Sequence, residues 1–124
     1  MKTNKFVTLW LPVIFYAVLI WLLSSQSRVT LPENLQFRFW DKCAHLLEYS
    51  VLGFLIYRAV KNYSPYFRFR IYSMLVAALY GGTDELHQSY VPGRQCDIFD
   101  LLFDSIGSGL GVWLYVLFQQ HKKK

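Results

Sequence analysis

Long uncharged runs of apolar residues alternate with short charged segments along the chain. The first run, residues 6–27, contains no acidic or basic side chain. A helix rises about 1.5 Å per residue, so about 20 residues cross the hydrocarbon core of a bilayer. A cleavable signal peptide usually has an apolar core of only about 7–15 residues and a small-x-small cleavage site. This run is longer and ends in Leu-Ser-Ser-Gln-Ser, which favours a retained membrane span.

The next two runs predict two more membrane helices. A polar and aromatic loop is expected over residues 28–40, and Asp41 then starts the second helix as its N-cap or first-turn acid. Residues 71–83 are uncharged, but they are too few to cross a bilayer alone. The third helix must therefore continue through Asp84 and Glu85.

The turn signal Val-Pro-Gly-Arg at residues 91–94 separates the third helix from a fourth. The predicted fold class is thus all-α, an integral membrane bundle of four transmembrane helices that forms a single domain over residues 1–124. Its predicted spans are residues 6–25, 42–60, 70–88 and 98–119.

Basic residues predict the orientation of this bundle. Most of the 13 lysines and arginines fall at the two termini and between the second and third spans. The positive-inside rule then places both termini in the cytoplasm, as in a multi-pass protein of the cytoplasmic membrane. All eight acids fall in the outer half, and because acids set topology only weakly, their position calls for a separate explanation.

Composition agrees with a membrane protein. The chain has 124 residues, of which 54% are hydrophobic and 19% aromatic, and a soluble domain of this length cannot bury so many large side chains. The net charge of +5 would suit nucleic acid, but the basic residues lie at segment ends and form no stripe, so we expect no nucleic-acid partner.

Acids on three helices reach a similar depth. Counted from the cytoplasmic edge, Glu48, Asp84 and Asp104 each lie about 20 Å into a core about 30 Å thick. Ionisable groups at such depth are rare, face the bundle interior and mark function by default. On the second helix, Asp41, His45 and Glu48 share this inward face.

These acids and the polar residues near them predict a pocket that opens outward. The candidates for catalysis are Asp41, His45, Glu48, Asp84, Glu85, Asp97 and Asp100, and the candidates for ligand binding are Lys42, Tyr49, Gln88 and Arg94. Arg94 is expected to orient acids or to grip a phosphate, because a guanidinium matches either one bidentately.

Three kinds of site stay open for these residues. A divalent metal is one, with His45, Glu48, Asp84 and Asp100 as candidate ligands, and such an ion activates water against a phosphate or an ester. The second is metal-free acid–base chemistry between coupled carboxylates and histidines. In the third, a structural network of ion pairs and shared protons holds the helices in register. Whether the protein is an enzyme is left open, and Cys43 and Cys96 are expected to be free thiols.

The polar motifs resemble those of the VanZ-like membrane protein family. The resemblance rests on Ser24-Ser25-Gln26, on Asp41-Lys42-x-x-His45-x-x-Glu48-Tyr49-x-x-Leu52-Gly53, on Asp84-Glu85-x-x-Gln88-x-x-x-Pro92-Gly93-Arg94-x-x-Asp97-x-x-Asp100, and on Gly107-x-x-x-Gly111. It covers nearly the whole chain. Two departures are that Asp104 stands where the family usually has Asn, and that His87 occupies a variable position.

The resemblance implies a compact bacterial membrane protein, in a family whose namesake is associated with resistance to teicoplanin. Together with an outward-facing pocket, it leads us to expect that the chain binds or acts on a cell-envelope lipid or a glycopeptide-related ligand. The expected partners are membrane lipids and a lipid-linked envelope precursor. The alternatives are a non-catalytic structural or binding protein and a small proton-coupled carrier.

Overall fold

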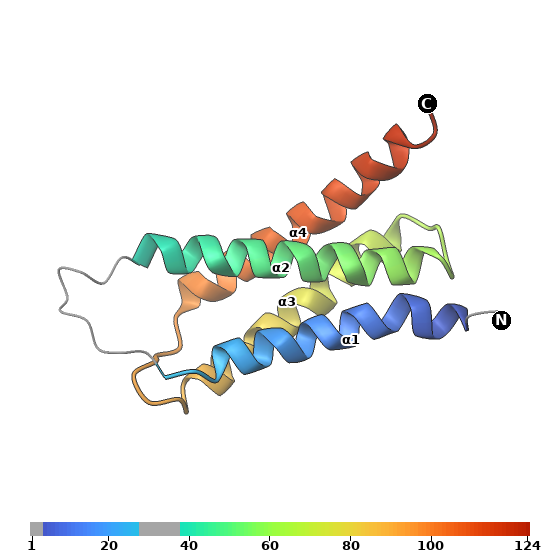
Figure 1. Cartoon of the computed structure of the whole chain (residues 1–124). Helices are drawn as coiled ribbons and strands as arrows, with labels where there is room; N and C mark the ends of the chain where they lie inside the picture. Colours follow the sequence, from blue (N-terminus) through green and yellow to red (C-terminus); the bar gives the residue numbers. More distant parts are fainter. Residues whose placement is uncertain (1–3, 28–37) are drawn as a thin grey trace.

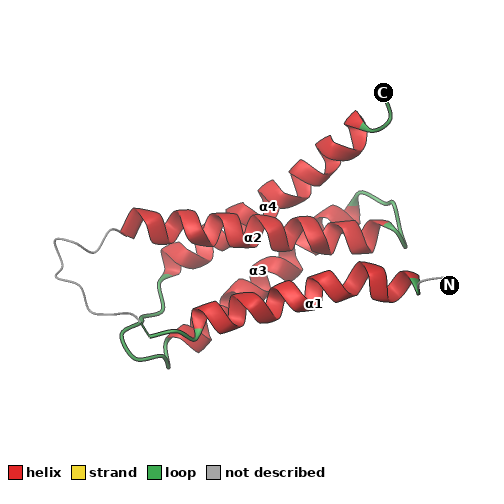
Figure 2. Ribbon diagram, in the orientation of Figure 1, coloured by secondary structure: helices red, strands yellow, loops and turns green. Residues whose placement is uncertain are grey.

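The computed structural model describes residues 4–27 and 38–124 of the chain. Across those two ranges, the regular secondary structure is entirely helical (Figure 2). The helices are α1 (Lys5–Ser24), α2 (Arg38–Lys61), α3 (Arg68–Gln88) and α4 (Ile98–His121) (Figure 1). The prediction of an all-α fold is therefore confirmed.

Among the helices of the described ranges, α1, α2 and α4 are long and apolar enough to cross a membrane. α3 has 21 residues and continues through Asp84 and Glu85 as predicted, but two arginines near its start and these two acids make it more polar. A fourth span therefore stays a prediction. The two termini lie toward the same end of the bundle (Figure 1), as an even number of crossings requires, and their cytoplasmic location stays a prediction as well.

Side chains cap the N-terminal ends of α1 and α4. The Asp97 carboxylate accepts a hydrogen bond from the backbone N–H of Phe99 at 2.9 Å and so fixes the start of α4. α2 begins at Arg38, so the expectation of a loop as far as residue 40 is wrong at its last three positions, and residues 28–37 lie outside the described residues. Asp41 is an acid of the first turn, where it favours the helix through the dipole.

Two glycines let α4 pack directly on the backbone of α2. A Cβ atom at Gly107 would overlap the carbonyl oxygen of Leu46, and one at Gly111 would overlap that of Ser50. The glycines at residues 107, 109 and 111 predict close approach of a neighbouring helix, and the structure confirms it at Gly107 and Gly111. Gly109 differs, because its nearest neighbour is the flexible end of Met74 on α3. The α2–α4 contact is the most extensive in the bundle and holds the polar site described below.

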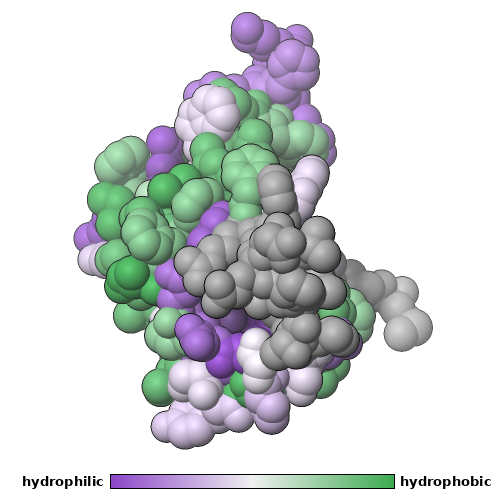
Figure 3. All heavy atoms as spheres, turned by 90° about the vertical axis from the view of Figure 1, so that its left-hand side faces the viewer, coloured by the Kyte–Doolittle hydropathy of each residue, from purple (hydrophilic) through white to green (hydrophobic). Residues whose placement is uncertain are grey.

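The outer surface of the bundle is largely apolar. Large hydrophobic side chains are exposed on every helix, among them Phe15, Leu47, Leu79 and Trp113. Seen from the end at which α4 begins, hydrophilic atoms appear beside the grey atoms near the middle and again at the top, and hydrophobic atoms cover much of the surface between them (Figure 3). This distribution, apolar outside and polar within, suits a bundle surrounded by lipid.

Candidate functional site

Polar side chains from different helices converge between the first half of α2, the last two turns of α3 and the first half of α4. They form three connected groups, which centre on Lys42, His45 and Asp84. Each group joins at least two helices. The sequence alone predicts that His45, Asp84 and Asp104 face inward, and the structure adds which residue meets which.

Lys42 ties α2 to the start of α4. Its ammonium donates to Asp97 at 2.5 Å and also to Asp100. The side chains of Lys42 and Asp100 are largely buried, whereas that of Asp97 is about one-third exposed. One positive charge thus lies between two carboxylates at the mouth of the site.

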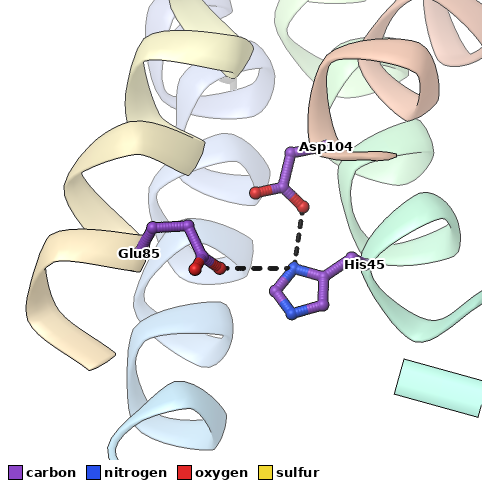
Figure 4. A group of neighbouring side chains, drawn as sticks. All are labelled: His45, Glu85 and Asp104. Atoms are coloured by element: carbon purple, nitrogen blue, oxygen red, sulfur yellow. Dashed lines mark hydrogen bonds and ion pairs between the residues drawn. The ribbon is translucent and has the colours of Figure 1, made fainter. Parts of the chain in front are cut away.

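His45 lies one turn deeper on α2 and is surrounded by acids. Its Nδ1 lies 2.8 Å from Oδ1 of Asp104 and 3.9 Å from Oε1 of Glu85 (Figure 4). On the other edge of the ring, Nε2 lies 3.6 Å from Oδ2 of Asp100. An ionised carboxylate only accepts hydrogen bonds, so Nδ1–H donates to Asp104 in this arrangement. The imidazole thus has a carboxylate on both of its edges.

Glu85 and Asp104 approach His45 from α3 and α4, and both are deeply buried. Glu85 is 2% exposed and Asp104 is 0% exposed. One oxygen of Glu85 accepts the backbone N–H of Asp97 at 3.0 Å. The other oxygen of Glu85 and Oδ2 of Asp104 have no hydrogen-bond partner among the described residues. Two buried carboxylate oxygens therefore remain available to a donor or a cation from outside the chain.

Gly81 makes room for Asp104 on the surface of α3. A Cβ atom at residue 81 would lie 2.8 Å from Oδ2 of Asp104, which is closer than such atoms come in proteins. The paired glycines at residues 81 and 82 predict tight packing or a local break in the helix. The structure shows tight packing at Gly81, and α3 is continuous through both residues. The absence of a side chain there lets the carboxylate reach its position beside His45.

Asp84 forms the third group, and it joins α3 to α1. It accepts a hydrogen bond from the hydroxyl of Ser24 and another from Gln88 at 3.3 Å. Gln88 also donates to the Ser24 hydroxyl at 3.3 Å. Asp84 and Glu85 are adjacent in sequence, but they point a quarter-turn apart around α3, so they belong to different groups.

The remaining candidates lie around these groups. Glu48 is half-buried, within electrostatic reach of His45, Asp84, Asp104 and Arg94, as the depth calculation predicts. The side chain of Tyr49 is fully buried beside Asp84 and Asp104. Asp41 is half-buried in the first turn of α2.

Arg94 lies in the turn between α3 and α4. Its backbone N–H donates to Val91 at 3.1 Å, and Gly93 adopts a positive φ of 79°. The predicted turn at residues 91–94 is thus confirmed. The side chain of Arg94 is half-buried, which places a guanidinium at the same end of the bundle as Lys42.

His87 lies apart from the acids around His45. Its ring stacks on Trp21 of α1 at a centroid distance of 3.9 Å, and its Nε2 lies 2.7 Å from the Ser25 hydroxyl. The half-buried His87 thus helps to hold α3 against α1. Cys43 and Cys96 are both free thiols, as expected.

An open groove of about 670 Å³ runs between α3 and the start of α4. Most of its walls are apolar and include Leu86, Ile98 and Phe99, whose side chains are exposed at the surface. Glu85 and Asp97 are the charged residues of its wall. Glu85 thus belongs both to the groove and to the group around His45.

Sequence reasoning places most of these residues on inward faces but leaves two of them off the candidate lists. Asp104 reaches the predicted depth, and its contact with His45 at 2.8 Å makes it central to the site. Ser24 holds Asp84, and its place in the Ser-Ser-Gln motif is the only signal for it in the sequence. The residues that the structure gathers as possible metal ligands are His45, Glu85 and Asp104, a different set from the predicted one.

Chemically, this arrangement suits proton exchange between an imidazole and carboxylates, or the binding of a cation. Residues 3–119 match the family model described as VanZ/LLP1, and the match includes every residue of the three groups. No curated protein and no solved structure matches the chain.

Proposed function

The protein belongs to the VanZ/LLP1 family, and from that premise we propose that it binds a lipid of the cell envelope. The apolar tail of the lipid lies in the groove, and its headgroup lies beside His45. The observation that carries the proposal is the double role of Glu85. This residue lines the apolar groove, and its carboxylate also lies 3.9 Å from His45. Glu85 thus connects an apolar groove to a buried polar site, and a ligand that is apolar at one end and polar at the other matches this arrangement.

The charges of the site favour particular headgroups. Carboxylates outnumber cations around His45, and two of the buried carboxylate oxygens have no hydrogen-bond partner among the described residues. Amino and hydroxyl groups satisfy such oxygens, whereas a bare phosphate is repelled by them. The sugar and peptide part of a lipid-linked envelope precursor supplies such hydroxyl and amide groups. Its phosphate linkage, which the carboxylates repel, is proposed to lie toward Lys42 and Arg94 at the same end of the bundle.

The outer leaflet is the proposed side of binding. This follows from the positive-inside rule, which places the beginnings of α2 and α4 away from the cytoplasm. Precursors of the cell wall are exposed there, which agrees with the glycopeptide association of the family's namesake.

A purely structural role is the second candidate, and a specific observation favours it. The contacts of Lys42, His45 and Ser24 connect all four helices through buried carboxylates. Such a network holds helices in register without any ligand. This role predicts that loss of any one carboxylate destabilises the bundle, and it predicts no effect that depends on lipid.

Binding of radiolabelled lipid-linked precursors to vesicles that contain the protein tests the proposal. Gly82 lines the groove, and the atom nearest to a Cβ there is 3.9 Å away on Leu101, so a larger side chain fits without a clash. Gly82→Leu therefore fills the groove. Ala44→Leu adds the same side chain at an exposed position of α2, outside the groove, and is the matched control. We expect Gly82→Leu to lose binding and Ala44→Leu to retain it. No binding by the wild type, or equal binding by both variants, overturns the proposal.

A further inference from the structure

We infer that His45, Glu85 and Asp104 form a binding site for a divalent transition-metal ion, of which Zn²⁺ fits best. One atom from each of these residues lies within 4.8 Å of the others, and all three residues are buried. The residues come from α2, α3 and α4, so an ion held by them joins three helices (Figure 4). This proposal concerns the same buried acids as the lipid-binding proposal, but it does not require that a lipid binds.

The distances suit a metal after a small adjustment of the side chains, chiefly a slight separation of His45 and Asp104. Ligands that bind an ion at about 2.0–2.2 Å lie roughly 3–4 Å from each other. Here Nδ1 of His45 lies 2.8 Å from Asp104 and 3.9 Å from Glu85. All three side chains lie on helices, which position metal ligands more rigidly than loops do.

The free carboxylate oxygens supply the second line of argument. Oε1 of Glu85 and Oδ2 of Asp104 are buried and have no hydrogen-bond partner among the described residues. A buried carboxylate oxygen left without a hydrogen-bond partner destabilises the folded protein. Oε1 of Glu85 faces His45 (Figure 4), so an ion between these ligands satisfies it directly.

Charge balance also favours a divalent ion. Glu85, Asp100 and Asp104 surround His45, and Lys42 is shared between Asp100 and Asp97. A protonated imidazole therefore offers a single positive charge to both Glu85 and Asp104. A divalent ion bound to a neutral imidazole balances these two carboxylates fully.

Asp100 has the position expected of a residue that supports a metal-bound histidine. If Nδ1 binds the ion, Nε2 carries the proton, and Oδ2 of Asp100 lies 3.6 Å from it. Histidines that bind metals usually donate their other N–H to a carboxylate, and loss of that partner typically lowers metal affinity 10- to 100-fold. At 3.6 Å the two atoms are just beyond hydrogen-bond distance, so Asp100 must approach slightly to accept this N–H. Asp100 is thus a positioning residue for His45.

The ligand types select the metal. An imidazole nitrogen favours Zn²⁺ and its transition-metal neighbours, whereas Mg²⁺ and Ca²⁺ favour sites made of oxygen alone. Three protein ligands leave a coordination position for water or for a ligand. Glu85 also lines the groove between α3 and α4, so the proposed ion lies next to the groove.

Metal binding to the purified full-length chain in lipid nanodiscs tests this inference without any lipid ligand. We expect about one zinc per chain by elemental analysis, and a Co²⁺-loaded protein with visible absorption bands of a three-ligand site. Glu85→Gln and Asp104→Asn keep the size of each side chain, and each is expected to lower zinc affinity more than 10-fold. His87→Gln is the matched control, because His87 is a half-buried residue of α3 that packs against α1 and lies outside the group.

Circular dichroism confirms that each variant is folded before its affinity is compared. Zinc binding that survives in both carboxylate variants, or that is lost in His87→Gln, overturns the inference. A folded wild-type protein that binds no zinc at micromolar concentration also overturns it. Because no lipid-linked precursor is present in this assay, a negative result leaves the precursor-binding experiment unaffected.

Discussion

Gly107→Ala provides a quantitative test of how α2 and α4 pack around the site. The added Cβ atom overlaps the carbonyl oxygen of Leu46, a backbone atom that cannot move without shifting α2. Overpacking of this kind typically costs about 1–3 kcal/mol, and a rigid backbone neighbour places it in the upper part of that range. Alanine is favoured over glycine inside a helix by about 1 kcal/mol, which offsets part of the cost. The expected net loss in free energy of unfolding is about 1–2 kcal/mol.

Gly109→Ala is a matched control on the same helix. Its Cβ atom would meet only Cε of Met74, at 3.0 Å, and this flexible end can move aside. The helix preference for alanine then dominates, so this variant is expected to equal or exceed the wild type by up to about 1 kcal/mol. Equilibrium unfolding with dodecyl sulfate in mixed micelles measures both values. If Gly107→Ala is as stable as the wild type, or Gly109→Ala loses as much, the proposed α2–α4 packing is wrong.

Two further predictions concern charge and orientation. Lys42→Met keeps the side-chain stem but leaves Asp100 without its ammonium partner, so the free energy of unfolding in the same assay should fall by about 1.5–3 kcal/mol. Lys123→Met in the exposed tail is the control and should leave that free energy unchanged. Cys96 is exposed in the connection between α3 and α4. In a Cys43→Ser background, an impermeant maleimide should therefore label Cys96 in intact cells. Lys124→Cys in a cysteine-free background should react with it only after the cells are permeabilised. The reverse pattern would contradict cytoplasmic termini.

The helices are predictable from sequence because long apolar runs and their caps are local signals. The third helix shows the strength of this reasoning, since its short uncharged run had to continue through Asp84 and Glu85, and α3 does so. The start of α2 shows the limit. Asp41 resembles a cap, but the helix begins earlier, at Arg38, because an acid is equally favourable within the first turn.

The site is predictable in part, since helical periodicity tells which residues share a face but not which face meets which helix. Glu85 points a quarter-turn from Asp84, and only the packing of α3 against α2 and α4 places it beside His45 rather than toward α1. The contact between Asp104 and His45 depends in addition on Gly81, a residue with no chemistry of its own. Pairings of this kind follow from tertiary packing, which the pattern of one helix does not contain.

The most direct test of a functional site at His45 is Glu85→Gln, measured for lipid binding and for stability in the same preparation. Glutamine keeps a carbonyl oxygen that can accept the backbone N–H of Asp97, so the free energy of unfolding should stay within about 1 kcal/mol of the wild type. If the site recognises a ligand, binding of radiolabelled lipid-linked precursor should fall at least 10-fold. Unchanged binding together with a large loss of stability would contradict the account and identify the acids as a structural network.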